Sequence, residues 1–218
     1  MIPLRALLQR SATPGITLLI IVLNTMCFLF EIRLPASEEV RFIHQYALIP
    51  DHLRLESLIT FMFLHGGWLH LIGNMWFLWV FGAHVENALG SGRFLIFYLL
   101  CGVVSAVVQL MTNLGSPVPT LGASGAIAGV MGAFLILYPR ARVVTLIILV
   151  IFITTIEIPA AFMLLYWFLM QLLSGLSTAH RFSDSGGVAW FAHVGGFLAG
   201  ILLLRFFPSV PRRRQLYY

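Results

Sequence analysis

Long apolar runs fill most of this chain and are separated by polar stretches. A helix needs about 20 mainly apolar residues to cross the hydrocarbon core of a bilayer, so the pattern predicts six membrane-spanning helices. Their approximate ranges are 16–31, 67–81, 94–112, 124–138, 160–176 and 189–206. The first run ends in Glu31-Ile32-Arg33, with no small-x-small cleavage site. We therefore expect a retained helix and not a signal peptide.

The connections between the runs differ in character. Residues 32–58 form a long polar loop, in which 40–48 favours a short interfacial helix. The polar segment 82–93 ends the second run. Residues 143–156 are apolar and rich in β-branched side chains, which lowers helix propensity, and we interpret them as a partly embedded loop or an interfacial segment.

The pattern thus predicts an all-α membrane protein, a bundle of six transmembrane helices with a long first outer loop. Composition agrees, since 60% of residues are hydrophobic and only 10% are charged, unlike a soluble domain. We divide the chain into an N-terminal segment (1–15), the helical domain (16–206) and a basic tail (207–218). Cys27 and Cys101 lie in apolar runs without CxxC context, and we expect both to be free, buried thiols.

All 13 basic residues are arginines, and their distribution predicts the topology. Cytoplasmic segments carry excess basic residues, and nine arginines fall on the side of both termini: Arg5, Arg10, Arg93, Arg140, Arg142, Arg205, Arg212, Arg213 and Arg214. Four fall on the other side: Arg33, Arg41, Arg54 and Arg181. We expect both termini to be cytoplasmic. The arginines form no basic face interleaved with aromatics, so nucleic-acid binding is not expected.

Three polar clusters lie inside the apolar runs: His70 with Asn74, Gly122-Ala123-Ser124-Gly125, and His193 before Gly195-Gly196. Polar groups at membrane depth are costly and point to a functional site. A serine at a helix start, a histidine and further hydrogen-bond donors are what acyl transfer requires. This interpretation makes Ser124 the nucleophile and His193 its base. No carboxylate accompanies His193 in its run, so a dyad is predicted and the group that orients the imidazole is not identified.

Each cluster also has a packing interpretation. Gly125 and Gly129, like Gly196 and Gly200, are spaced four apart, and small residues at this spacing allow close helix approach. We therefore expect the fourth and sixth runs to be neighbours. A buried histidine can serve packing alone, and His70 and Asn74, on one helix face, can serve as interhelical hydrogen-bond donors.

Taken together, the motifs resemble the rhomboid family of intramembrane serine proteases. They are His65-x4-His70-x3-Asn74, Gly82-x2-Val85-Glu86, Gly122-x-Ser124-Gly125 and Ala192-His193-x2-Gly196-x3-Gly200. The resemblance implies a Ser124–His193 dyad and an oxyanion hole formed by His70, Asn74 and the Ser124 backbone N–H. It implies a structural role for Glu86, Gly196 and Gly200, with His65, Gly122 and Gly125 as possible accessory positions. It further implies cleavage of transmembrane substrates near the outer membrane face, with no cofactor or metal.

The chain departs from the family pattern at two places. Some members carry an aromatic residue four positions after the serine, where it stacks on the histidine, and this chain has Ala128 there. Some have a Trp-Arg pair in the first loop, whereas residues 32–58 contain no tryptophan. The first departure leaves open how the imidazole is held.

Other functions compete with proteolysis. A catalytically silent relative that binds client transmembrane helices requires the loss of a catalytic residue, whereas Ser124 and His193 are both present. A haem-binding bundle uses histidines such as His65, His70, His84 and His193 as axial ligands but does not explain Ser124. A small transporter does not predict a serine facing a histidine. We expect a multi-pass protein of a prokaryotic plasma membrane, with the substrate and oligomeric state left open.

Overall fold

The structure is a computed structural model that describes residues 2–9, 12–149, 152–178 and 189–208. Part of the arginine distribution used above lies outside the described residues, namely Arg10, Arg181, Arg212, Arg213 and Arg214. So does 209–218, which is most of the predicted tail.

The described chain is mostly helical, as the apolar runs predict. The principal helices are α1 (Gly15–Glu31), α4 (Trp68–Phe77), α6 (Ser91–Thr112), α7 (Ser124–Leu137), α8 (Ala160–Thr178) and α9 (Trp190–Leu203). Within the described residues, 91–112 and 160–177 are long and apolar enough to cross a membrane. Three shorter helical segments, 15–31, 124–137 and 190–206, are apolar as well.

The shorter elements occupy the connections. The loop after α1 holds α2 (Ala36–Tyr46), η1 (Pro50–His52), α3 (Ser57–Thr60) and η2 (Phe61–Phe63), and η4 (Leu204–Phe206) extends α9. The predicted helix at 40–48 therefore exists but begins at Ala36.

The second apolar run continues further than predicted. A π-helical turn, η3 (Leu78–Gly82), follows α4 and leads directly into α5 (Ala83–Leu89). Gly90, with φ +81°, then separates α5 from α6. The expectation that the helix ends near Phe81 was wrong, because Val85, Glu86 and Leu89 are buried against the bundle and the segment is therefore not a solvated connection.

A small antiparallel sheet corrects the all-α prediction. Its strands are β1 (Ile2–Ala6), β2 (Arg142–Leu149) and β3 (Phe152–Pro159), in the order β1-β2-β3. Ile2 pairs with Leu146, and Val143 pairs with Ile158. The segment interpreted as a partly embedded loop is thus a β-hairpin. The β-branched residues that argued against a helix favour a strand, and pairing satisfies their backbone groups.

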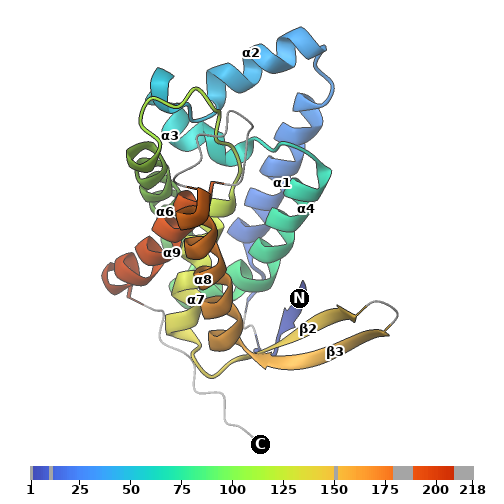
Figure 1. Ribbon diagram of the computed structural model, residues 1–218. Coiled ribbons are helices and arrows are strands. Elements are labelled where there is room, and N and C mark those ends of the chain that lie inside the picture. The colour runs from blue at the N-terminus through green and yellow to red at the C-terminus, as the bar shows by residue number, and fades with distance from the viewer. Residues whose placement is uncertain (1, 10–11, 150–151, 179–188, 209–218) are drawn as a thin grey trace, which may run out of the picture.

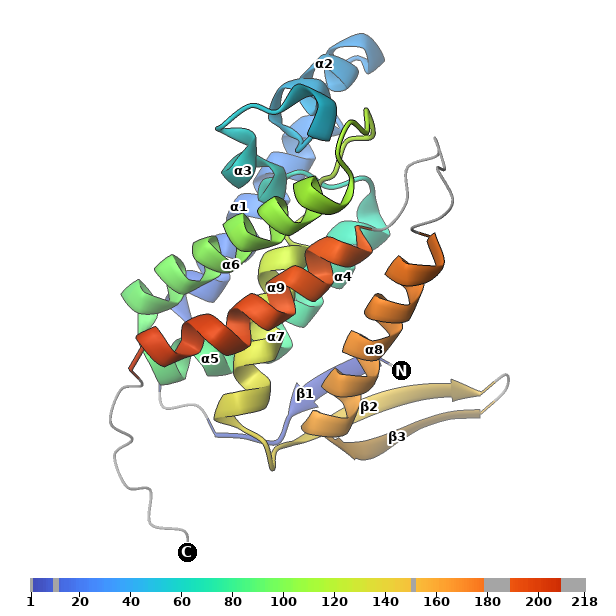
Figure 2. The ribbon, with the colours of Figure 1, turned by 60° about the vertical axis from the view of Figure 1, so that its left-hand side comes forward.

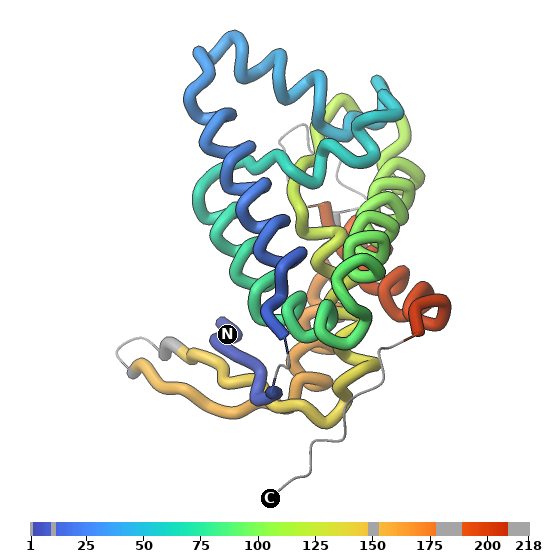
Figure 3. Tube along the Cα trace, turned by 180° about the vertical axis from the view of Figure 1, so that it is seen from behind, coloured from blue at the N-terminus to red at the C-terminus, as the bar shows by residue number. Residues whose placement is uncertain are grey.

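The sheet and the long first loop lie at opposite ends of the bundle (Figure 1). We call them the sheet end and the α2 end. At the α2 end, a backbone bridge joins Leu48 to Thr120, so the first loop is tied to the segment that precedes α7. Seen from behind, α1 runs alongside α4, and β1 lies across the sheet end (Figure 3). Helix α8 lies beside α9, on the side away from α6, and follows directly after β3 of the hairpin (Figure 2).

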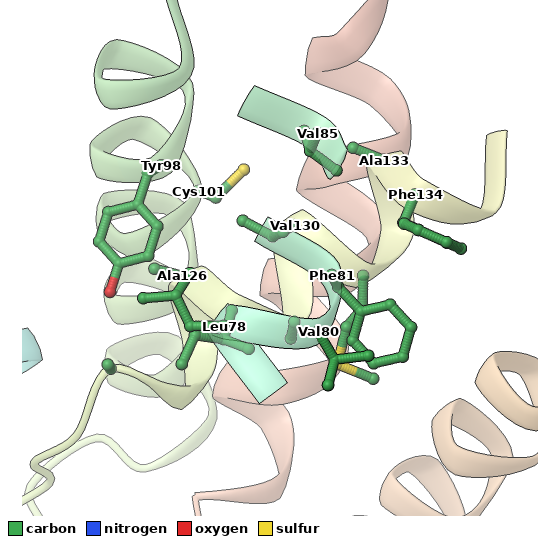
Figure 4. Close-up of a cluster of buried hydrophobic side chains, with 14 of the residues drawn as sticks. Leu78, Val80, Phe81, Val85, Tyr98, Cys101, Ala126, Val130, Ala133 and Phe134 are labelled. Atoms are coloured by element: carbon green, nitrogen blue, oxygen red, sulfur yellow. The ribbon is translucent and has the colours of Figure 1, made fainter. Parts of the chain in front are cut away.

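The core lies where η3, α5, α6 and α7 meet, and Figure 4 shows the side chains that fill it. Leu78, Phe81, Val85, Tyr98 and Phe134 have almost no exposed surface. Cys101 is also buried there. Both cysteines are free thiols as expected, but Cys27 is only partly buried. This core packs against α7, which also packs against α9.

Candidate functional site

Ser124 is the first residue of α7. The conformation of the loop before it is set by Gly122. Gly122 adopts φ +123°, a conformation that side-chain-bearing residues rarely adopt. Its N–H donates a 2.8 Å hydrogen bond to the Phe61 carbonyl. The first N–H groups of a helix lack partners within the helix. The backbone at Ser124 is therefore suited to donate hydrogen bonds to an anionic oxygen.

Glycines bring α7 and α9 into backbone contact. A Cβ on Gly196 would lie 2.0 Å from the Gly125 carbonyl oxygen, and one on Gly200 would lie 1.8 Å from the Gly129 carbonyl oxygen. Only glycine permits this approach. The expectation that these two helices are neighbours is confirmed, and their glycines form the contact itself.

This close packing places His193 against Ser124. Nε2 of His193 lies 2.7 Å from Oγ of Ser124, within hydrogen-bond distance. The imidazole is buried and the serine is half-buried. The distance lies within the range required of a nucleophile and its general base.

His70 and Asn74 line the other side of the loop that leads to Ser124. A Cβ on Gly122 would lie 2.7 Å from His70 Nε2 and 3.5 Å from Asn74 Nδ2. The two side chains therefore face the backbone of the Gly122-Ala123-Ser124 turn, with no room for a residue larger than glycine at 122. Two side chains with N–H groups thus converge on the turn that carries Ser124.

His65 lies just before α4, where it holds Asn74. Nδ2 of Asn74 is 3.0 Å from His65 Nε2, and the His65 and His70 rings meet edge to face at 5.1 Å. The His65 backbone N–H donates to the buried Glu31 carboxylate at 3.3 Å. Burial, aided by the nearby His70, lowers the pKa of His65 to about 4. Its ring is therefore neutral at physiological pH and can accept the Asn74 amide hydrogen.

The sequence did not identify the residues that hold His193 from α8. Nδ1 of His193 lies 2.7 Å from Oε1 of Gln171, and the Trp167 ring lies 5.7 Å from the imidazole at an interplanar angle of 37°. Trp190 approaches edge-on at 6.5 Å. A signal was present, because Gln171 is a polar residue inside a predicted span, the same criterion that singled out His193.

Glu86 lies at the sheet end, away from this cluster, and its hydrogen bonds link the N-termini of α1 and α6. Its carboxylate accepts hydrogen bonds from the Ile16 and Thr17 backbone N–H groups at 2.9 and 2.8 Å, and from the hydroxyls of Thr17 and Ser91 at 2.8 and 2.7 Å. It thereby caps the first turn of α1, where a negative charge is favoured.

Comparison with known proteins places the chain in a family. Residues 52–209 match the family described as Rhomboid domain. A similar protein is "Rhomboid protease GluP" of Bacillus subtilis (strain 168), 36% identical over 131 residues, covering 58% of this chain and 25% of that protein. The "Presenilin-associated rhomboid-like protein A, mitochondrial" of Danio rerio is 32% identical, covering 84% of this chain and 45% of that protein.

A third relative is "Rhomboid protein 1, mitochondrial" of Saccharomyces cerevisiae, 29% identical over 74% of this chain and 45% of that protein. The chain thus spans between a quarter and about half the length of these relatives. Two of them are named as mitochondrial, which does not fit an expectation restricted to a prokaryotic plasma membrane. Because the family match covers most of the chain, this protein belongs to the rhomboid family.

Proposed function

We propose that this protein is an intramembrane serine endopeptidase that cleaves transmembrane protein substrates through a Ser124–His193 dyad. The observation that carries the proposal is the 2.7 Å separation of Ser124 Oγ and His193 Nε2 across two helices held together by glycine. Family membership supports the same chemistry, since one relative is named a protease. A catalytically silent relative would lack one of the catalytic residues, whereas this chain has both Ser124 and His193.

In the first half of the reaction, His193 Nε2 accepts the Ser124 hydroxyl proton while Oγ attacks the carbonyl carbon of the scissile bond. The carbonyl oxygen becomes an oxyanion. His70, Asn74 and the Ser124 backbone N–H lie around the same turn and are the donors that we assign to it. Collapse of this intermediate breaks the C–N bond, and His193 gives its proton to the departing amine, which leaves Ser124 acylated.

In the second half, a water molecule loses a proton to His193 and attacks the acyl carbon. The ester bond to Oγ then breaks, Ser124 regains its proton from His193, and the carboxylic product is released. A peptide bond inside a helix is protected by its own hydrogen bonds. We therefore expect substrates whose helix is weakened near the site by glycine or proline.

The proposed topology has six spans, with the α2 end facing outward and the sheet end on the cytoplasmic, arginine-rich side. In this arrangement η3 and α5 extend the second span, and Ser124 and His193 lie near the outer ends of the fourth and sixth. The water that hydrolyses the acyl-enzyme and the extended substrate would then enter from the α2 end.

The proposal is tested by labelling the detergent-purified protein with a fluorophosphonate probe, which reacts with an activated serine hydroxyl. We expect labelling of the wild type and none of Ser124→Ala or His193→Ala. The matched control is Ser105→Ala, which removes a buried serine whose hydroxyl donates only to the Gly102 carbonyl of its own helix. Labelling that survives in Ser124→Ala contradicts the assignment. A folded wild type that neither labels nor cleaves a helical substrate favours the silent, client-binding alternative.

A further inference from the structure

The mechanism leaves one requirement unmet, which is a group that fixes the protonation pattern of His193. A neutral imidazole carries its proton on either Nδ1 or Nε2. Only the form protonated on Nδ1 has a lone pair on Nε2 with which to accept the Ser124 proton. In serine proteases with a triad, a buried carboxylate selects that form and orients the ring.

Gln171 occupies the corresponding place. Its Oε1 lies 2.7 Å from His193 Nδ1, on the edge of the ring opposite Ser124, and its side chain is buried. An amide oxygen only accepts hydrogen bonds, so Nδ1 must carry the proton in this contact. The lone pair then lies on Nε2, 2.7 Å from Ser124 Oγ.

The neighbours of Gln171 hold the ring in the same position. Trp167 is one helical turn before Gln171 on α8, and its ring lies against both His193 and Phe197 of α9, at 5.7 and 6.3 Å. His193 and Phe197 are themselves one turn apart. Two successive turns of α8 therefore face two successive turns of α9, so that one residue orients the imidazole edge and another covers its face.

We propose that Gln171 is a positioning residue, which accepts the Nδ1 hydrogen of His193 and so keeps the lone pair of Nε2 directed at Ser124. The proposal rests on the proposed function, because it assigns to Gln171 the orientation of the base in that reaction. An amide carries no charge. Gln171 therefore selects the tautomer and the ring orientation without the electrostatic support that a carboxylate gives to an imidazolium.

Three variants test the role by the rate of fluorophosphonate labelling. Gln171→Leu removes the acceptor at similar size, and we expect the rate to fall by about 10- to 100-fold, since a misplacement of about 1 Å costs about 100-fold. Gln171→Glu retains an acceptor oxygen and should restore most of the rate. Gln109→Leu is the matched control: it also removes a buried glutamine from a membrane helix, but one whose Nε2 donates to Thr120, and it should label as the wild type does.

A nitrogen-15 spectrum of the imidazole supplies a readout that a loss of packing would not produce. In the wild type, the His193 signals should show a protonated Nδ1 and an unprotonated Nε2. In Gln171→Leu they should shift toward a mixture of the two tautomers. With cleavage of a helical substrate, the loss should appear in kcat and not in KM, because Gln171 acts on the orientation of the base.

The outcomes separate this proposal from the proposed function. Wild-type labelling together with an unchanged rate in Gln171→Leu refutes the positioning role and leaves the protease assignment intact. Equal loss in Gln171→Leu and Gln171→Glu, both folded, refutes the acceptor role. If the folded wild type neither labels nor cleaves a helical substrate, the protease assignment fails. The nitrogen-15 spectra then test only whether Gln171 sets the His193 tautomer. Loss of Nδ1 protonation in Gln171→Leu supports that role, and identical spectra of the two proteins refute it.

Discussion

The glycine contact between α7 and α9 leads to a quantitative prediction for Gly196→Ala. The added Cβ would lie 2.0 Å from the Gly125 carbonyl oxygen, whereas Cβ atoms essentially never come closer than 3.0 Å to such an atom. The carbonyl oxygen is a backbone atom and the position of the Cβ is fixed by the backbone, so neither can rotate away. The two helices must therefore move apart by about 1 Å near this point, which is the shortfall in that contact.

Such a shift acts directly on the dyad, because Ser124 precedes Gly125 and His193 lies one turn before Gly196. The Nε2–Oγ distance of 2.7 Å would lengthen to about 3.7 Å, beyond the reach of about 3.2 Å that proton transfer requires. We expect fluorophosphonate labelling to slow by about 100-fold. Overpacking of this kind should lower the free energy of unfolding by about 1–3 kcal/mol.

The assay compares labelling rate and thermal unfolding in detergent for Gly196→Ala and Gly92→Ala. Gly92 lies in the first turn of α6, and a Cβ there meets nothing within 4 Å. The Gly92 variant should therefore label at the wild-type rate and melt at the same temperature or slightly higher. A Gly196→Ala protein that labels and melts like the wild type would refute the argument that backbone contact sets the geometry of the dyad.

Three further predictions concern residues around the site and the helix ends. Asn74→Ala should reduce kcat by about 100-fold without abolishing it, since one of several oxyanion donors is worth about 3 kcal/mol; a loss as complete as that of Ser124→Ala would contradict this role. Glu86→Gln should lower the unfolding free energy by about 1.5–3 kcal/mol, measured by thermal unfolding, because charged hydrogen bonds to α1 are weakened, while labelling of the folded protein is unchanged. The pKa of His65 is about 4 in the folded protein, below its ordinary value of 6.5, so the unfolded chain binds a proton there at a higher pH than the folded protein does. The free energy of unfolding is therefore highest above pH 6.5 and decreases as the pH falls toward 4. Thermal unfolding between pH 7 and pH 4 should accordingly depend less steeply on pH in His65→Gln, and equal slopes would contradict the shift.

The sequence predicted the positions of the main helices well, because a membrane-spanning helix requires a long apolar run and such runs are visible in the sequence. The expected range 16–31 corresponds to Gly15–Glu31, and 160–176 corresponds to Ala160–Thr178. It failed where packing overrides local polarity. Residues 83–89 look like a polar connection but remain helical because the bundle buries them. In 143–156, the pairing with β1 that completes the sheet involves residues far away in the chain.

The candidate site divides in the same way. Ser124, His193, His70 and Asn74 were recognisable by type and spacing, and the structure brings them to one turn. The support from α8 was not identified: polarity inside a predicted span marks Gln171, but a lone glutamine in an apolar run has no spacing that links it to His193. Buried Asn24, for example, satisfies the same polarity criterion but donates to the Ile20 carbonyl of its own helix. Ala128 left the imidazole without the expected stacking partner, and Trp167 reaches that ring from another helix.

The sheet constrains how the chain is threaded through the bilayer. β1 pairs with β2, so residues 2–6 and 142–149 must lie on the same side of the membrane. An even number of crossings must therefore separate them, and in the proposed topology these are the four spans formed by α1, by α4 with η3 and α5, by α6 and by α7. This parity follows from strand pairing and is independent of the arginine count, and it holds whichever side is cytoplasmic. During synthesis, β1 must also wait for its partner until all the intervening helices have been made.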